Sequence, residues 1–185
     1  AILKVIPSLQ KKGVEVSYIK PDNDGIIQLE AIKEKIQVNT KLISIMYVNN
    51  ELGTINPIKE IADFCYNKNI LLHSDGVQAL GKIPIDMKHI PVNFLSMSAH
   101  KLYGPKGVGA LFIKKGSVIN PLIHGGGQEA NLRGSTENII GICGFGLAAE
   151  IATENIMKNS DYINQLGIHL VNKLNNKKIL YKING

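Results

Sequence analysis

The sequence predicts an α/β fold with a mostly parallel sheet and helices on both faces. Short apolar runs typical of buried strands alternate with longer segments whose apolar residues recur at helical spacing. The run over 42–48 is almost continuously apolar, as expected of a parallel strand that is covered on both sides. The chain shows no internal repeat that would indicate a different architecture.

The expected elements follow from apolar periodicity and from turn residues. In chain order they are a strand at 14–19, a helix at 29–38, a strand at 42–48 and a helix at 57–67. Three strands follow at 70–73, 94–97 and 108–113, then helices at 136–157 and 161–174 and a strand at 179–183. Thr136 is expected to cap the long helix at its N-terminus.

The strand-and-helix alternation gives way to two successive helices near Met157. This change predicts a large domain over 1–157 and the beginning of a smaller domain over 158–185. The chain begins with Ala1 and ends at Gly185, just after a strand-like run. We therefore expect it to be a piece of a longer protein.

Composition favours a soluble globular protein over several other classes. Hydrophobic residues make up 44% of the 185 residues, and the net charge of +6 comes from lysines spread along the whole chain. Because the lysines form no basic stripe and the chain has no tryptophan, nucleic-acid binding is disfavoured. No apolar run is long enough to span a membrane, and the start has no signal-peptide pattern.

The two cysteines, Cys65 and Cys143, lie in predicted helices and lack metal-ligand spacing. We expect both to be small buried side chains with reduced thiols, and no metal site is predicted. Reduced thiols indicate a reducing, cytoplasmic-type compartment.

Polar clusters follow three of the predicted strands, at the point where each strand ends. They cover residues 49–51, 74–78 and 98–101. In open α/β sheets, ligands bind outside the carboxyl ends of the strands, so the three clusters are expected to meet at one edge.

The clusters contain the groups that an aldehyde cofactor with a pyridine ring needs. The amine of Lys101 could form an imine with an aldehyde. A carboxylate at Asp75 could keep a pyridinium nitrogen protonated, which makes the ring an electron sink. Taken singly, Lys101 is more often a surface lysine, and Asp75 could equally be an ordinary turn residue, so the joint pattern carries the prediction.

Four further side chains could complete such a site. Gln78 could reach the ring from another side, and Asn50 could donate to a phenolic oxygen. Ser98 and His100, at alternate positions, could both face a phosphate. Simpler interpretations remain open, because Asn49 and Asn50 could cap a turn and His100 could be structural.

Four ordered motifs give a specific resemblance. The segment 73–78 resembles the H-x-D-x-x-Q segment of class V pyridoxal-phosphate (PLP) enzymes, and 96–109 is similar to the S-x-H-K-x-x-G-P-K-G-x-G signature of cysteine desulfurases. The segments 48–53 and 124–129 look like the NifS/IscS branch of that family. The resemblance covers essentially the whole chain and implies the large domain of PLP fold type I enzymes.

The resemblance implies one role for each matching residue. Lys101 would bind PLP covalently, Asp75 would pair with the pyridinium nitrogen, Gln78 would bond the phenolic oxygen, Asn50 would lie over the ring, Ser98 and His100 would bind phosphate, and Thr136 would reach the phosphate of a partner subunit. Thr136 follows Ser135, where the family usually has glycine. Two other lysines lie near motifs: Lys82 is interpreted as a surface position and Lys106 as support for a turn.

The resemblance also implies an activity, namely removal of sulfur from L-cysteine to give L-alanine and an enzyme-bound persulfide. The family forms homodimers and passes sulfur to acceptors such as an iron–sulfur scaffold or the machinery of tRNA thiolation. The nucleophilic cysteine is expected beyond Gly185, and a ring-stacking histidine before Ala1. This piece alone is therefore expected to be inactive.

Two alternatives keep the same fold. Another class V enzyme, such as an aminotransferase or selenocysteine lyase, would retain Asp75, Gln78 and Lys101. A non-catalytic scaffold would need none of these side chains, so their joint presence argues against it.

Overall fold

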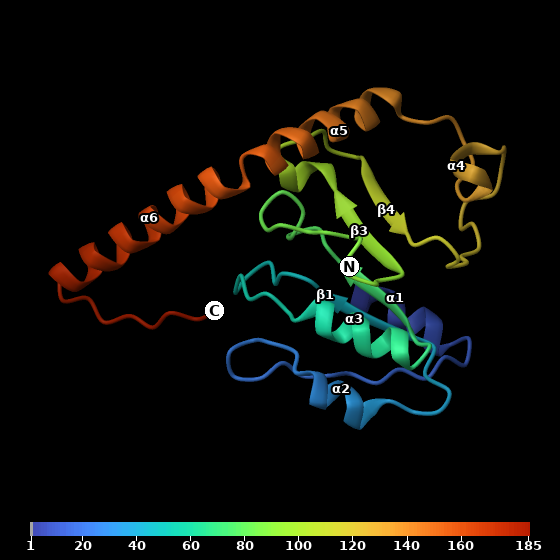
Figure 1. Ribbon diagram of the computed structural model, residues 1–185, viewed down its shortest axis with the longest axis horizontal. Helices are drawn as coiled ribbons and strands as arrows, with labels where there is room; N and C mark the ends of the chain where they lie inside the picture. Colours follow the sequence, from blue (N-terminus) through green and yellow to red (C-terminus); the bar gives the residue numbers. More distant parts are fainter. Residues whose placement is uncertain (1) are drawn as a thin grey trace.

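A computed structural model describes residues 2–185, and its centre is a four-stranded sheet in the order β1-β2-β3-β4 (Figure 1). The strands are β1 (Leu42–Met46), β2 (Leu71–Asp75), β3 (Phe94–Ser98) and β4 (Gly109–Ile113). The first three are parallel, which confirms the predicted α/β fold with a mostly parallel sheet. β4 runs antiparallel to β3, because the connection between them is too short for the crossover that a parallel strand requires.

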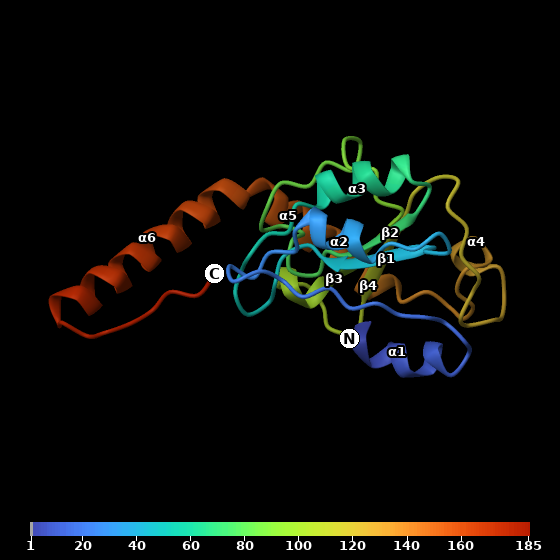
Figure 2. The same cartoon turned by 90° about the horizontal axis from the view of Figure 1, so that it is seen from below.

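Helices lie on both faces of this sheet, as the sequence predicts. They are α1 (Ile2–Gln10), α2 (Leu29–Lys35), α3 (Ile58–Asn67), the 3₁₀ helix η1 (Ala99–Leu102), α4 (Gln128–Asn131), α5 (Ile139–Glu154) and α6 (Ile156–Asn176). Figure 2 shows α2 and α3 on one face of the sheet and α1 on the other.

The main core lies between the sheet and the pair α2 and α3. Helix α3 buries Ile61 and Cys65, which recur at helical spacing and pack against Leu72 of β2 and Leu95 of β3. Each large apolar side chain buried in this way contributes about 1.5–3 kcal/mol to folding. The prediction that Cys65 is a buried thiol is confirmed, and burial raises its pKa to about 11.

Two predicted strands are wrong. Residues 14–20 and 177–185 include no strand, and the side chains of Val14, Tyr18 and Leu180 are exposed. Their residue types favour strands, but strand formation depends on cross-strand packing, which these segments lack. Helix α1, which contains Pro7, was not predicted.

The predicted helix over 136–157 is shorter than expected at both ends. Asn138, and not Thr136, caps α5, because its Oδ1 accepts from the backbone N–H of Gly141 at 3.1 Å. The helix stops at Asn155, whose side-chain amide donates to the carbonyl of Ile151 at 2.7 Å and so competes with the backbone ladder.

Helix α6 begins at Ile156, earlier than the predicted start at residue 161, and none of its residues is buried. Figure 1 shows it extending away from the sheet. The predicted domain boundary between residues 157 and 158 falls in its first turn and stays a prediction.

The prediction that Cys143 is buried is wrong. Cys143 is exposed on α5, whose apolar residues surround the whole helix, so that several of them, including Ile140 and Leu147, also face outward. Among residues 2–185, no single helix has the length and hydropathy needed to cross a membrane, whereas the bent pair α5 and α6 meets those criteria together.

Candidate cofactor site

The carboxyl ends of β1, β2 and β3 lie along one edge of the sheet. Met46 is paired with Asp75, and Asp75 with Ser96, so the three strands end at nearly the same level. The polar segments that follow these strands therefore start from adjacent points, and the predicted convergence of the three strand ends is confirmed.

Asn49 and Asn50 have different surroundings in the turn after β1. The Oδ1 atom of Asn49 accepts from the backbone N–H groups of Glu51 and Leu52, both at 2.9 Å. Asn49 is thus the residue that caps the turn, as one of the simpler interpretations expected. Asn50 is exposed, which leaves its amide accessible to a ligand.

Asp75 is the last residue of β2 and is half-buried. Its Oδ1 accepts from the backbone N–H of Val77 at 3.1 Å, whereas its Oδ2 has no hydrogen-bond partner among residues 2–185. One oxygen therefore fixes the carboxylate and the other is available to a donor on a ligand. The next residue, Gly76, must remain small, since a Cβ there would lie 2.7 Å from the side chain of Leu95.

Gln78 is oriented by Lys82, which is exposed, as the sequence predicted. The ammonium group of Lys82 donates to Oε1 of Gln78, and this fixes which end of the amide carries the acceptor. The Nε2 donor of Gln78 is then free for a ligand oxygen, the role that the resemblance implies. Burial lowers the pKa of Lys82, and the charge of Lys101 lowers it further, which places both lysines in one electrostatic neighbourhood.

Ser98 and His100 form the third part of the site, at the end of β3 and in η1. The hydroxyl of Ser98 lies 2.8 Å from Nδ1 of His100, so the two side chains act as one polar pair. In η1, Ala99 and Leu102 are buried against Phe145 of α5, whereas His100 and Lys101 between them are exposed. Residues three apart share a face of a 3₁₀ helix, and this spacing turns Lys101 outward.

The backbone holds Lys101 between two hydrogen bonds. Ala99 donates its N–H to Val108 at 3.2 Å, and Gly104 donates to Ala99 at 3.0 Å. Tyr103 closes the turn in a left-handed conformation with φ 63°, a strained geometry of the kind that often accompanies functional sites. Lys106 is exposed in the turn before β4, beside Gly107 with φ 78°, and so fits its interpretation as part of the loop.

Thr136 does not join this group in the structure. It lies in the connection between α4 and α5, and Figure 1 shows this connection projecting beyond β4, away from the ends of β1 and β2. Ser135, which stands where the family usually has glycine, has φ 84°. This left-handed backbone gives the physical reason for the family's glycine at that position.

Another residue that the sequence interpretation left without a role is His73, two positions before Asp75. Its Nδ1 lies 2.8 Å from the hydroxyl of Ser44, and its Nε2 lies 2.9 Å from the hydroxyl of Ser96. Burial lowers the pKa of His73, and the nearby charge of Asp75 partly offsets this by raising it. The motif contained His73, but its two partners lie on other strands, and no local pattern points to them.

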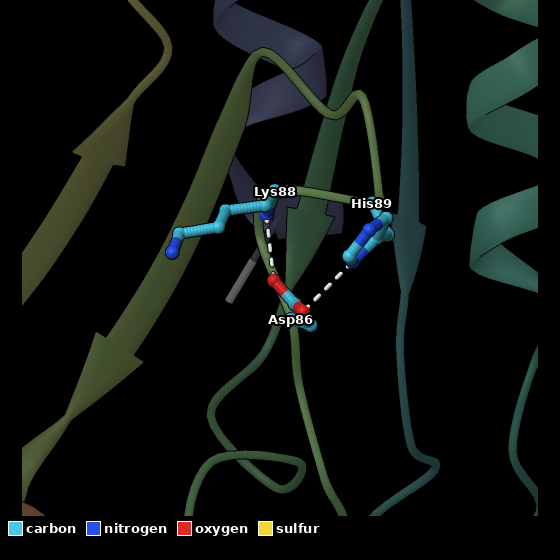
Figure 3. Close-up of polar contacts among 3 residues, drawn as sticks. All are labelled: Asp86, Lys88 and His89. Carbon is cyan, nitrogen blue, oxygen red and sulfur yellow. Dashed lines mark hydrogen bonds and ion pairs between the residues drawn. The ribbon is translucent and has the colours of Figure 1, made fainter.

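A different aspartate–histidine pair, shown in Figure 3, belongs to an exposed turn between β2 and β3. Asp86 accepts from the backbone N–H of Lys88 and from Nδ1 of His89, each at 2.8 Å. The bond from Lys88 lowers the pKa of Asp86 most, followed by the bond from His89. These contacts stabilise the turn locally and lie outside the cluster at the strand ends.

Comparison with known proteins identifies the family. The model of the family described as aminotransferase class-V matches residues 1–184. The chain belongs to this family. A cysteine desulfurase IscS from Clostridium botulinum (strain Hall) is 48% identical over the whole chain, and a mitochondrial cysteine desulfurase from Arabidopsis thaliana is 44% identical over 96% of it. The chain covers 47% and 40% of these relatives, so it spans about half the length of the curated relatives it matches.

Solved structures confirm the fold and the branch indicated by the motifs. A NifS-like protein superposes with a TM-score of 0.90 at 42% identity, over 95% of this chain and 48% of that one. The structure described as SspA in complex with cysteine has a TM-score of 0.78 at 42% identity, over 80% of this chain and 44% of that one.

Proposed function

We propose that the full-length protein containing this chain is a PLP-dependent cysteine desulfurase, and that this chain supplies its cofactor lysine. The observation that supports the proposal is that the segments bearing Asp75, Gln78 and Lys101 follow the ends of two paired strands, in a chain whose relatives are cysteine desulfurases. Each side chain offers one chemical group that a pyridoxal cofactor requires.

The donor set fits PLP. Lys101 would hold the aldehyde carbon through its amine, and the free Oδ2 of Asp75 would hold a proton on the ring nitrogen. Nε2 of Gln78 would donate to the phenolic oxygen, Asn50 would lie over the ring, and the hydroxyl–imidazole pair of Ser98 and His100 would bind phosphate oxygens. When bound, PLP supplies an electron sink that stabilises negative charge next to the substrate amine.

The residues of this chain would bind and orient PLP, whereas the sulfur chemistry would require a nucleophilic cysteine from another part of the full-length protein. Neither free thiol is suited to act as nucleophile, since Cys65 is buried with its pKa raised to about 11 and Cys143 lies within helix α5 rather than on a loop that could reach the substrate. We propose that the persulfide forms on a cysteine beyond Gly185. The substrate would be L-cysteine and the product L-alanine. The sulfur would pass to an acceptor such as an iron–sulfur scaffold, in a reducing, cytoplasmic-type compartment.

Borohydride reduction of the full-length protein with PLP, followed by peptide mass mapping, tests the cofactor assignment. We expect a pyridoxyl adduct on Lys101 in the wild type and in Lys106→Ala, and its loss in Lys101→Ala. Lys106 is the matched control, because it is an exposed lysine of the same loop. An adduct on Lys106 would overturn the site, and no adduct at all would favour a non-catalytic scaffold.

The reaction itself is tested by incubating the full-length protein with L-cysteine. Release of L-alanine together with protein-bound sulfur supports a desulfurase. A keto acid product, formed by amino-group transfer, would instead identify an aminotransferase of the same family, and release of alanine from selenocysteine alone would identify a selenocysteine lyase.

We further propose that the enzyme is a homodimer in which Thr136 completes the partner's site. Its exposed position on the connection beyond β4 supports this role. Mixed dimers of a Lys101→Ala chain and a Thr136→Ala chain then contain one intact site and regain activity, provided that Thr136→Ala alone is impaired. If Thr136 acts within its own chain, the mixed dimers contain no intact site and stay as inactive as the parents.

A further inference from the structure

Three side chains form a hydrogen-bonded row across β1, β2 and β3. Ser44, His73 and Ser96 contribute one residue each, and the imidazole of His73 is the middle member, with both ring nitrogens bonded at 2.8 and 2.9 Å. Most contacts between neighbouring strands involve one pair, whereas this row ties three strands together through a single ring.

The row lies on the same face of the sheet as the carboxylate of Asp75 and next to it along the strands. Side chains two residues apart project from the same face of a strand, so His73 and Asp75 share a face of β2. Ser44 stands opposite His73 in the β1–β2 register, and Ser96 stands opposite Asp75 in the β2–β3 register. The His73–Ser96 bond therefore runs diagonally, from the residue below Asp75 to the residue beside it.

The chemistry of the row favours an uncharged imidazole. A serine hydroxyl can donate or accept, so a neutral ring satisfies both nitrogens in either tautomer. Burial lowers the pKa of His73 and this outweighs the opposite effect of Asp75, which keeps the ring neutral at pH 7. A neutral ring does not pair with the Asp75 carboxylate, whose charge stays available to a ligand.

We propose that His73 is a positioning residue, which holds Asp75 at the ring nitrogen of the cofactor by fixing the ends of β1, β2 and β3 relative to one another. The inference rests on the proposed PLP function and deepens it. Asp75 has one fixed oxygen and one free oxygen, so a small rotation of β2 would move the free oxygen away from a ring nitrogen. The His73 row is what opposes that rotation from the two flanking strands.

The test uses the full-length protein loaded with PLP labelled with ¹⁵N in the ring, because the ring-nitrogen chemical shift reports its protonation directly. The variant His73→Phe keeps the ring shape and removes both hydrogen bonds, and His73→Gln keeps one donor and one acceptor. The exposed His89 gives the matched control variants, His89→Phe and His89→Gln (Figure 3). Asp75→Asn serves as the reference for a ring nitrogen without a carboxylate.

We expect the signal of His73→Phe to move from the wild-type position towards that of Asp75→Asn, and the Kd for PLP to rise about tenfold, by analogy with groups that orient metal ligands. His73→Gln is expected to restore most of both values, and the His89 variants to leave both unchanged. A wild-type ring-nitrogen signal in folded, PLP-loaded His73→Phe would reduce His73 to a structural residue and overturn the proposal.

Two milder variants keep the proposal testable if His73→Phe fails to fold. Ser96→Ala and Ser44→Ala each remove one bond of the row, and Ser96→Ala is expected to have the larger effect on the ring nitrogen, because Ser96 stands beside Asp75. Equal wild-type signals in both variants would overturn the proposal. A wild-type protein that binds no PLP would instead refute the proposed function itself, which the borohydride experiment detects separately.

Discussion

Gly109 of β4 is paired with Ser98, the last residue of β3, and has almost no space for a side chain. A Cβ added at Gly109 would lie 2.7 Å from the carbonyl oxygen of Met97, which is about 0.7 Å less than the 3.4 Å at which ordinary contact begins. The obstacle is backbone, so it cannot rotate away, and β3 and β4 must separate locally. Overpacking of this kind costs about 1–3 kcal/mol. We expect Gly109→Ala to lower the free energy of unfolding by that amount.

The assay is urea unfolding of the 185-residue chain, followed by circular dichroism. Gly167→Ala is the matched control, because Gly167 lies within α6 and a Cβ there would meet nothing within 4 Å. Alanine favours the helix over glycine by about 0.8–1 kcal/mol, so the control should be stabilised. The reasoning would be refuted if Gly109→Ala were as stable as Gly167→Ala. In the full-length protein, displacement of Ser98 should also weaken PLP binding.

Three further outcomes are expected. Lys82→Met frees the amide of Gln78 and should raise the Kd for PLP about 2–10-fold in a titration, whereas Lys88→Met, at an exposed turn, should not. Ser135→Gly relieves a left-handed backbone and should raise the free energy of unfolding by about 1 kcal/mol; a loss of stability in urea would contradict the strain. The pKa of His73 lies below 6.5 in the folded chain, so the unfolded chain binds more protons as the pH falls below 6.5, and stability should fall there by up to about 1.4 kcal/mol per pH unit. His73→Gln should remove this fall in stability at low pH. An unchanged dependence of stability on pH in that variant would contradict the prediction.

The sequence was sufficient for the parts of the fold that depend on local pattern. The alternation of apolar runs and helical spacing predicted β1, β2, β3 and α3 to within a few residues, and the order of strand ends predicted that Asp75 and Lys101 would come from neighbouring strands. Strand-like residue types at 14–19 were misleading, because a strand needs a partner and the sequence does not show which segments pair.

Three side-chain contacts of the structure were not predicted from the sequence. Lys82 lies four residues after Gln78 and could have been paired with it from spacing alone, but its place directly after Gly81 favoured a surface interpretation without a role in the site. The partners of His73 lie 29 and 23 residues away along the chain, on strands whose register only the structure provides. The cap at Asn138 was missed because Thr136 offered another capping side chain two residues earlier.

The antiparallel direction of β4 has a consequence for the order in which the site assembles. β3, η1 and β4 form a hairpin whose contacts are close in sequence, whereas β1 and β2 join through a helical crossover. Local contacts form faster than distant ones during folding, because less chain must be ordered before they are made. The hairpin of β3, η1 and β4, which carries Lys101, should therefore fold first, and the β1–β2 pair, which carries Asp75, should pack against it later. In pulse-labelled hydrogen exchange, the amides of β3 and β4 would gain protection before those that link β1 to β2.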